Sequence, residues 1–181
     1  MRSRPRLRKF ALTAHVITSV GWLGAVVVFL ALSVVGLTSQ QAPVVRAAYL
    51  AMESIGWLVL VPLSIASLLT GLIQALGTKW GLLQHYWVLM KLAINVIATI
   101  VLLLYMQSLS YLAGLAEQTA LPDGNLDGLR SPSPALHAAA ALLLLLVAAT
   151  LSVYKPRGMT RYGQRKQLQR RAALSRTATR A

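Results

Sequence analysis

Long apolar stretches alternate with short polar segments along this chain. Four stretches of mostly apolar residues cover residues 11–36, 53–76, 86–111 and 135–154. An α-helix needs about 20 such residues to cross a membrane. A soluble domain of this size could not bury four such helices, because its outer helices would need polar faces. We therefore expect an all-α, polytopic membrane protein that forms a four-transmembrane-helix bundle over residues 11–154.

Basic residues lie mainly in the two segments that flank this bundle. The net charge is +14, and most Lys and Arg fall in residues 1–10 and in the tail, residues 155–181. Between the spans, Arg46 and Arg130 are the basic residues that we assign to the longer loops. Cytoplasmic segments of membrane proteins carry the Lys and Arg excess. The sequence therefore predicts a multi-pass protein of the cell (inner or plasma) membrane with both termini cytoplasmic.

The basic tails limit the choice of partners. Anionic lipid attracts such segments by about 1 kcal/mol for each basic residue near the surface. No RNA- or DNA-binding motif accompanies them, so we expect contact with the bilayer and no nucleic-acid partner. The oligomeric state is left open.

Several chemistries lack their residues here. The chain has no cysteine, which excludes disulfides, thiolate metal sites and cysteine nucleophiles. No HExxH, GxSxG or Walker-type motif is present. Of the four acidic residues, we expect Glu53 alone to lie near a span, at its outer start, so two-carboxylate catalysis within the bundle is excluded.

Small residues and one proline predict where the helices approach closely and where one of them is distorted. Close approach of helices in lipid depends on small side chains, and Gly21 in the first span and Gly71 in the second are spaced with other small residues. Pro62 lacks a backbone N–H and should disturb the second span.

Polar residues within the spans fall into two layers. His15 and Lys91 lie at similar depth near the cytoplasmic side, whereas Glu53 and His137 are expected at the outer side, where each can reach the interface. Ser19 and Trp22 share a face with His15, and Trp87 and Asn95 flank Lys91. Intramembrane ionisable groups are functional candidates by default. Two readings stay open: His15 and Lys91 border one polar pocket, or Lys91 bends to the interface and pairs with nothing.

Two stretches resemble known membrane families. "AHVITSVGWLGAVVVFLAL", residues 14–32, resembles the four-helix unit of copper-resistance protein D and its relatives. "GLIQALGTKWGLLQHYWVLMKLAINVIATIVLLL", residues 71–104, is similar to an uncharacterised bacterial integral-membrane family. The architecture more distantly resembles the J-type protoporphyrinogen oxidase, a haem-associated four-helix protein. Its histidine in helix 1 and lysine in helix 3 match His15 and Lys91 here, and this resemblance implies a b-type haem or another tetrapyrrole.

The candidate site follows from these residues. We name His15, Lys91 and Asn95 as candidate cofactor-binding residues, and His15 with His85 as candidate metal ligands. The expected function is that of an inner-membrane protein with a tetrapyrrole or metal site near the cytoplasmic side of helices 1 and 3. Two alternatives stay open: a non-enzymatic scaffold whose polar groups set helix register, and a small protein related to copper transport. No reaction is predicted.

The charge distribution generates a test of topology. A reporter that is active only outside the cytoplasm should be silent when it is fused after Ala181, and it should be active when it is inserted in the loop of residues 112–134. The reason is that both basic segments resist translocation. Activity of the fusion after Ala181 would contradict the predicted orientation.

Overall fold

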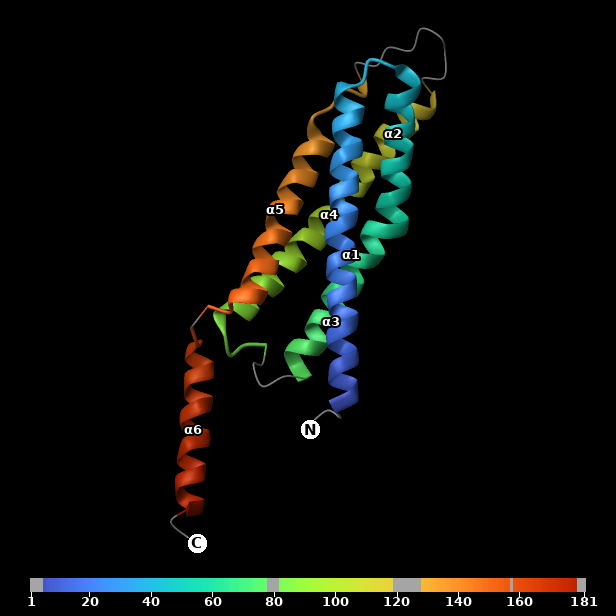
Figure 1. The fold of residues 1–181 in the computed structure, drawn as a ribbon. Helices are drawn as coiled ribbons and strands as arrows, with labels where there is room; N and C mark the ends of the chain where they lie inside the picture. Colours follow the sequence, from blue (N-terminus) through green and yellow to red (C-terminus); the bar gives the residue numbers. More distant parts are fainter. Residues whose placement is uncertain (1–4, 78–81, 119–127, 157, 179–181) are drawn as a thin grey trace.

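Helices make up almost all of the described chain. The computed structural model describes residues 5–77, 82–118, 128–156 and 158–178, and no strand element is present in these ranges. The elements are α1 (Pro5–Thr38), α2 (Ala42–Ile55), the π-helical turn η1 (Gly56–Leu60), α3 (Val61–Gly77), α4 (Tyr86–Gln118), α5 (Ser133–Tyr154) and α6 (Arg161–Ala178) (Figure 1).

The four expected spans are present as four long apolar helical segments. They cover Arg6–Thr38, Ala42–Leu76, Tyr86–Gln118 and Ser133–Tyr154, and each is long and apolar enough to cross a membrane. The second span is one continuous segment built from α2, η1 and α3. The predictions of an all-α chain and of a bundle with four helical segments long and apolar enough to cross a membrane are confirmed.

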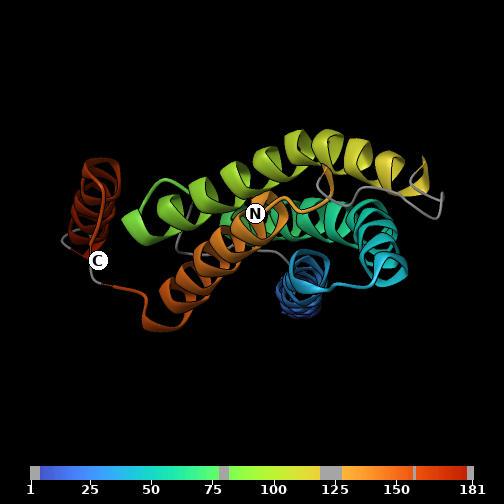
Figure 2. The ribbon, with the colours of Figure 1, turned by 90° about the horizontal axis from the view of Figure 1, so that it is seen from above.

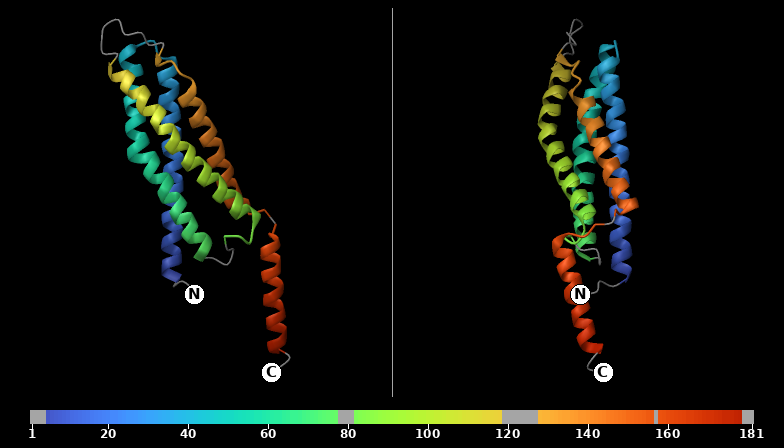
Figure 3. Two further views of the ribbon diagram at one scale, coloured as in Figure 1. Left: turned by 180° about the vertical axis from the view of Figure 1, so that it is seen from behind. Right: turned by 90° about the vertical axis from the view of Figure 1, so that its left-hand side faces the viewer.

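The four segments run up and down side by side (Figures 1, 2 and 3). α1 packs against α2, α3 and α5, and α4 packs against the same three helices. α1 and α4 begin at the same end of the bundle, where α3 and α5 finish (Figure 1). We call this the basic end, because Arg6, Arg8, Lys9 and Lys155 lie there, and we call the opposite end the loop end.

The start of the second span differs from the prediction. The sequence placed a loop before Glu53, but α2 begins at Ala42 and only residues 39–41 connect it to α1. Pro43 in the first turn suits a helix start, where its missing N–H costs nothing. Val45 and Tyr49 then bury one face of the added turns. Arg46 is therefore a helix residue, and its Nε donates to the carbonyl of Ala116 at 2.8 Å.

Pro62 lies directly after the π-helical turn. A proline removes one backbone donor and crowds the preceding turn, and a π-turn is one way for a helix to absorb this. The amide of Val61 donates to the carbonyl of Gly56, five residues earlier. Gly56 also lets α4 approach closely, since a Cβ at this position would lie 2.6 Å from Cε of the fully buried Met106.

α6 begins at a specific contact with the turn before α4. The backbone N–H of Thr160 donates to the carbonyl of Gln84 at 3.0 Å, and its hydroxyl donates to the carbonyl of Leu83 at 2.5 Å. The same hydroxyl oxygen accepts from the N–H of Gly163 at 3.1 Å and so caps the helix. From this contact α6 points away from the bundle, past the basic end, and it does not fold back under the other helices (Figures 1 and 3). Binding of this tail to anionic lipid stays a prediction.

The contact between η1 and α4 generates a prediction of stability. Gly56→Ala should destabilise the protein by about 1–3 kcal/mol, because the new methyl group overpacks a filled core. The second change Met106→Val removes the clashing atoms and should recover part of this loss, so the two effects will not add. Thermal unfolding in detergent measures both.

The matched control is Gly114→Ala, on α4, where a Cβ meets nothing within 4 Å. Equal losses for Gly56→Ala and Gly114→Ala would contradict the close approach of the two helices.

Candidate functional site at the basic end

His15, Lys91 and Thr70 bring three helices together near the basic end. Nζ of Lys91, in the second turn of α4, lies 3.2 Å from Nε2 of His15 on α1. Nδ1 of the same ring lies 3.2 Å from Oγ1 of Thr70 on α3. His15 is 5% exposed, so the ring is an internal link between its neighbours.

The hydrogen bonds of this cluster all donate in the same direction, from Lys91 toward α3. A charged lysine only donates, so Nε2 of His15 accepts and the ring proton lies on Nδ1. Nδ1 then donates to Oγ1 of Thr70, whose own proton goes to the carbonyl of Ala66 at 2.6 Å. In this series of hydrogen bonds, each donor faces an acceptor. Both ring nitrogens of His15 are therefore occupied in this arrangement.

Gly71 makes room for the imidazole. A Cβ at this position would lie 3.0 Å from Cε1 of His15, which is tighter than ordinary van der Waals contact. The Cε1 edge of the ring therefore lies close to the backbone of α3 at Gly71, next to the hydrogen-bond partner Thr70. A larger residue at position 71 would push the ring out of line with Lys91.

A polar strip continues from this cluster into the bundle. Ser19 and Ser67 share a hydrogen bond of 2.8 Å between α1 and α3. On α4, Asn95 and Thr99 follow Lys91 at one-turn spacing, and they are 7% and 5% exposed. The Thr99 hydroxyl has no hydrogen-bond partner within the described residues. The strip thus retains unused hydrogen-bonding capacity at Thr99, two turns from Lys91.

Lys91 has no acidic neighbour among the described residues. Glu117 lies at the far end of the same helix, about 40 Å along its axis. Glu53 lies on α2, which enters the bundle from the loop end. Asp123 and Asp127 fall outside the described residues. The ammonium group therefore has a neutral hydrogen-bond acceptor but no counter-charge, which leaves it able to attract an anion.

The predicted site residues are only partly brought together. His15 and Lys91 lie within hydrogen-bonding distance, so the reading in which Lys91 pairs with nothing is wrong. Asn95 lies one turn away on the same helix. His85 lies before α4, where it forms an isolated bridge with Met159 and its ring centroid is 6.4 Å from that of Trp87.

The metal and cofactor roles are untested. Within the described ranges, no group of three or more His, Cys, Asp or Glu residues could hold a metal ion. The roles proposed for His15, His85, Lys91 and Asn95 stay predictions.

Sequence reasoning missed the contribution of α3. Gly71 is predicted from the sequence as a small residue for helix packing, but hydrogen bonds from Thr70 and Ser67 to α1 are not. The available signal was a polar spacing of three to four residues on α3 that matches the spacing of His15 and Ser19. Small hydroxyl residues serve helix packing and hydrogen bonding equally well, so this spacing does not identify a site by itself.

The fold and this site together define a class. The protein is a helical bundle whose four spans are long and apolar enough to cross a membrane, with a small polar cluster at the basic end. Comparison with protein-family models, with curated proteins and with solved structures finds no match to this chain. The resemblances noted from the sequence stay expectations.

The packing of His15 on Gly71 generates a test. Gly→Ala in an open helical position stabilises a helix by roughly 0.5–1 kcal/mol. Gly71→Ala should lose this gain, because its methyl group presses on the His15 ring. It should also change the side-chain ¹⁵N shifts of His15, because the Nε2 bond to Lys91 is disturbed. NMR of labelled protein in micelles and thermal unfolding measure the two effects.

Gly24→Ala is the matched control on α1, where a Cβ has nothing within 4 Å. The contact is contradicted if Gly71→Ala leaves the His15 shifts unchanged.

Proposed function

We propose that this integral membrane protein binds an anionic, amphipathic ligand at its basic end, and that a haem-type tetrapyrrole is the candidate ligand class. The observation that supports this is the position of Lys91. Its ammonium lies 3.2 Å from a neutral imidazole and far from the described carboxylates, and the unpaired hydroxyl of Thr99 lies two turns further along the same helix. A ligand carboxylate would supply the missing counter-charge through a charge-assisted hydrogen bond.

His15 limits how a metal-containing ligand could bind. A histidine ligates iron through an unprotonated ring nitrogen, and Nε2 of His15 here accepts from Lys91. An anionic group that attracts the Lys91 ammonium would release this nitrogen. The residues therefore fit a ligand that carries both a carboxylate and a metal better than a bare metal ion. When bound, such a group would supply redox or ligand-binding chemistry, while Lys91 holds its carboxylate and Thr70 orients the imidazole.

The basic end also favours an anionic ligand over a longer range. Arg6, Arg8 and Lys9 lie exposed on the first turns of α1, within two to three turns of His15. Clustered like charges raise the local concentration of an oppositely charged ligand. The proposed orientation, with this end in the cytoplasm, would draw the ligand from that side.

A scaffold function is the second candidate, and a specific observation favours it as well. The bonds His15–Thr70, Ser19–Ser67 and Lys91–His15 join α1, α3 and α4 in one register. Interhelical hydrogen bonds in membranes contribute about 0.6 kcal/mol each on average. If this were their only role, removing Lys91 would change stability slightly and would change no binding.

Titration with haem and with metal-free protoporphyrin separates these functions. Lys91→Met should weaken binding of both compounds about tenfold, since one charge-assisted bond to a carboxylate is lost. His15→Ala should weaken haem binding and shift its Soret band, but it should leave metal-free protoporphyrin nearly unaffected. Absorbance spectra of purified protein in nanodiscs measure both.

Lys9→Met is the matched control for charge, and His85→Ala tests the second candidate histidine. His85 is predicted as a metal ligand, so a haem-specific loss in His85→Ala would add it to the site. Absence of binding by folded wild-type protein, with unchanged or raised stability of Lys91→Met, would replace the ligand-binding proposal by the scaffold.

A further inference from the structure

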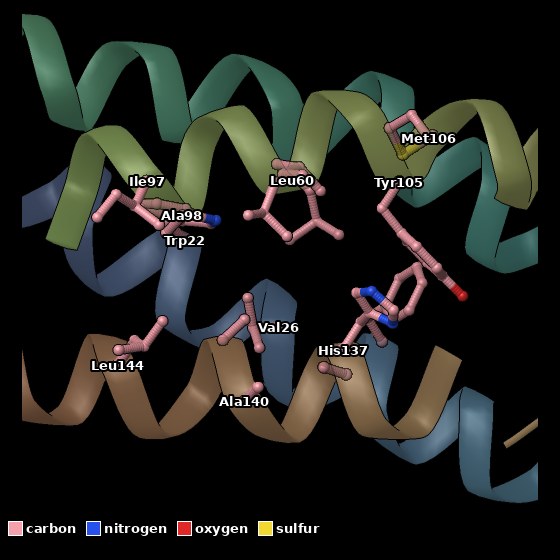
Figure 4. Close-up of a pocket in the computed structure, with 15 residues that line it drawn as sticks. Trp22, Val26, Leu60, Ile97, Ala98, Tyr105, Met106, His137, Ala140 and Leu144 are labelled. Atoms are coloured by element: carbon pink, nitrogen blue, oxygen red, sulfur yellow. The ribbon is translucent and has the colours of Figure 1, made fainter. Parts of the chain in front are cut away.

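A second feature lies deeper in the bundle, separate from the basic-end cluster. It is a cavity of about 110 Å³ between α1, η1, α4 and α5 (Figure 4). Its walls are apolar apart from three aromatic side chains that carry polar atoms: Trp22, Tyr105 and His137. Roughly 150 Å³ is the size of an engineered cavity that binds benzene. The space is thus on the scale of one six-membered ring and far too small for a tetrapyrrole.

The cavity opens sideways, toward the surface of the helix bundle. Its floor is buried, with Trp22 2%, Leu60 3% and Phe29 4% exposed. Ile97 on α4 and Leu144 on α5 also line it, and they are 55% and 39% exposed. These exposed residues mark a mouth between α4 and α5. Since both helices belong to candidate spans, the mouth faces hydrocarbon and admits a ligand that is dissolved in the bilayer.

Trp22 supplies a hydrogen-bond donor at one end. Its indole is almost wholly buried, and its N–H has no hydrogen-bond partner among the described residues. Tryptophan N–H groups usually find a partner when they are buried. Figure 4 shows the Trp22 indole at the opposite end of the space from His137 and Tyr105. A ligand oxygen would satisfy this donor.

His137 supplies an acceptor at the other end. Its Nδ1 lies 2.9 Å from the carbonyl oxygen of Ser133, which can only accept, so Nδ1 carries the proton. When the ring is uncharged, its lone pair is therefore on Nε2. Tyr105 stacks on this imidazole with ring centroids 4.1 Å apart and an interplanar angle of 20°, which holds its orientation. The hydroxyl of Tyr105 is buried without a hydrogen-bond partner in the described part of the chain.

We propose that this cavity binds the ring of a membrane quinol. A quinol carries two hydroxyl groups at opposite ends of one six-membered ring. One oxygen can accept from the Trp22 N–H, and the other hydroxyl can donate to Nε2 of His137. The matching quinone has no hydroxyl to give, so its oxygen would face the lone pair of Nε2. The site therefore prefers the reduced ring, and the alkyl tail leaves through the mouth into lipid.

Binding of three decyl-tailed probes to the full chain in nanodiscs tests the proposal. The probes are decylhydroquinone, decylbenzoquinone and decylbenzene. The wild type should bind decylhydroquinone about tenfold more tightly than decylbenzoquinone, as expected for one well-placed hydrogen bond, and more tightly still than decylbenzene, which offers no oxygen. His137→Phe keeps a stacking ring but loses the acceptor, and it should abolish the preference over decylbenzoquinone. Trp22→Phe should weaken both oxygen-bearing probes several-fold and leave decylbenzene unchanged.

A variant that fills the cavity tests the proposal even if the His137 and Trp22 variants misfold. Ala141→Phe on α5 fills the cavity and should remove saturable binding of all three probes. Leu143→Phe is its control, because Leu143 is exposed and does not line the cavity. His15→Ala and Lys91→Met should leave quinol binding unchanged, which separates this site from the one at the basic end.

Two results would overturn the proposal. One is equal binding of decylbenzene and decylhydroquinone, unaffected by His137→Phe, which would make the cavity a gap filled by lipid chains. The other is no saturable binding of decylhydroquinone by folded wild-type protein.

Discussion

A polar side chain inside a bundle of apolar helices can find a partner at few places. In this protein such places form one strip shared by α1, α3 and α4. Lys91 bonds to His15, His15 to Thr70, and Ser19 to Ser67. Each bond joins two different helices. Leaving a buried donor or acceptor without a partner costs about 1–3 kcal/mol, so helix positions that keep these groups paired are favoured. The relative heights of the three helices depend on this requirement.

Two histidines illustrate how surroundings decide the role of one residue type. Nε2 of His15 accepts from Lys91, which leaves the ring without a free lone pair. Nδ1 of His137 donates to a backbone carbonyl of its own helix, which leaves Nε2 available beside an apolar cavity. The first ring is part of an internal chain of hydrogen bonds that a ligand must displace. In the second ring, Nε2 can accept a hydrogen bond from a ligand when the ring is uncharged.

The two candidate sites differ in depth and in access. The basic-end cluster lies where α1 and α4 begin, near exposed arginines and lysines. The cavity lies deeper along the same helices, and Trp22 of α1 reaches it two turns beyond His15. An anionic, amphipathic ligand that approaches from the basic end suits the first position, whereas a ligand dissolved in the bilayer suits the second. No residue is shared between the two sites.

The sequence by itself determined the class of fold and the number of spans. A soluble domain of this size cannot bury four apolar stretches of this length, so their lengths alone indicate four membrane-spanning helices. The sequence also placed His15 and Lys91 at one depth, because both are counted from helix starts at the same end.

Only the tertiary structure decided which groups meet. Rotation of each helix about its axis sets whether Lys91 faces His15 or lipid, and an almost uniformly apolar helix carries little periodicity to define that rotation. The partnership of Thr70 and Gly71 with His15 and the apposition of Trp22, Tyr105 and His137 depend on the same rotations. Contacts between residues far apart in sequence, such as those 55 and 76 positions apart in the His15 cluster, follow from packing that no local pattern encodes.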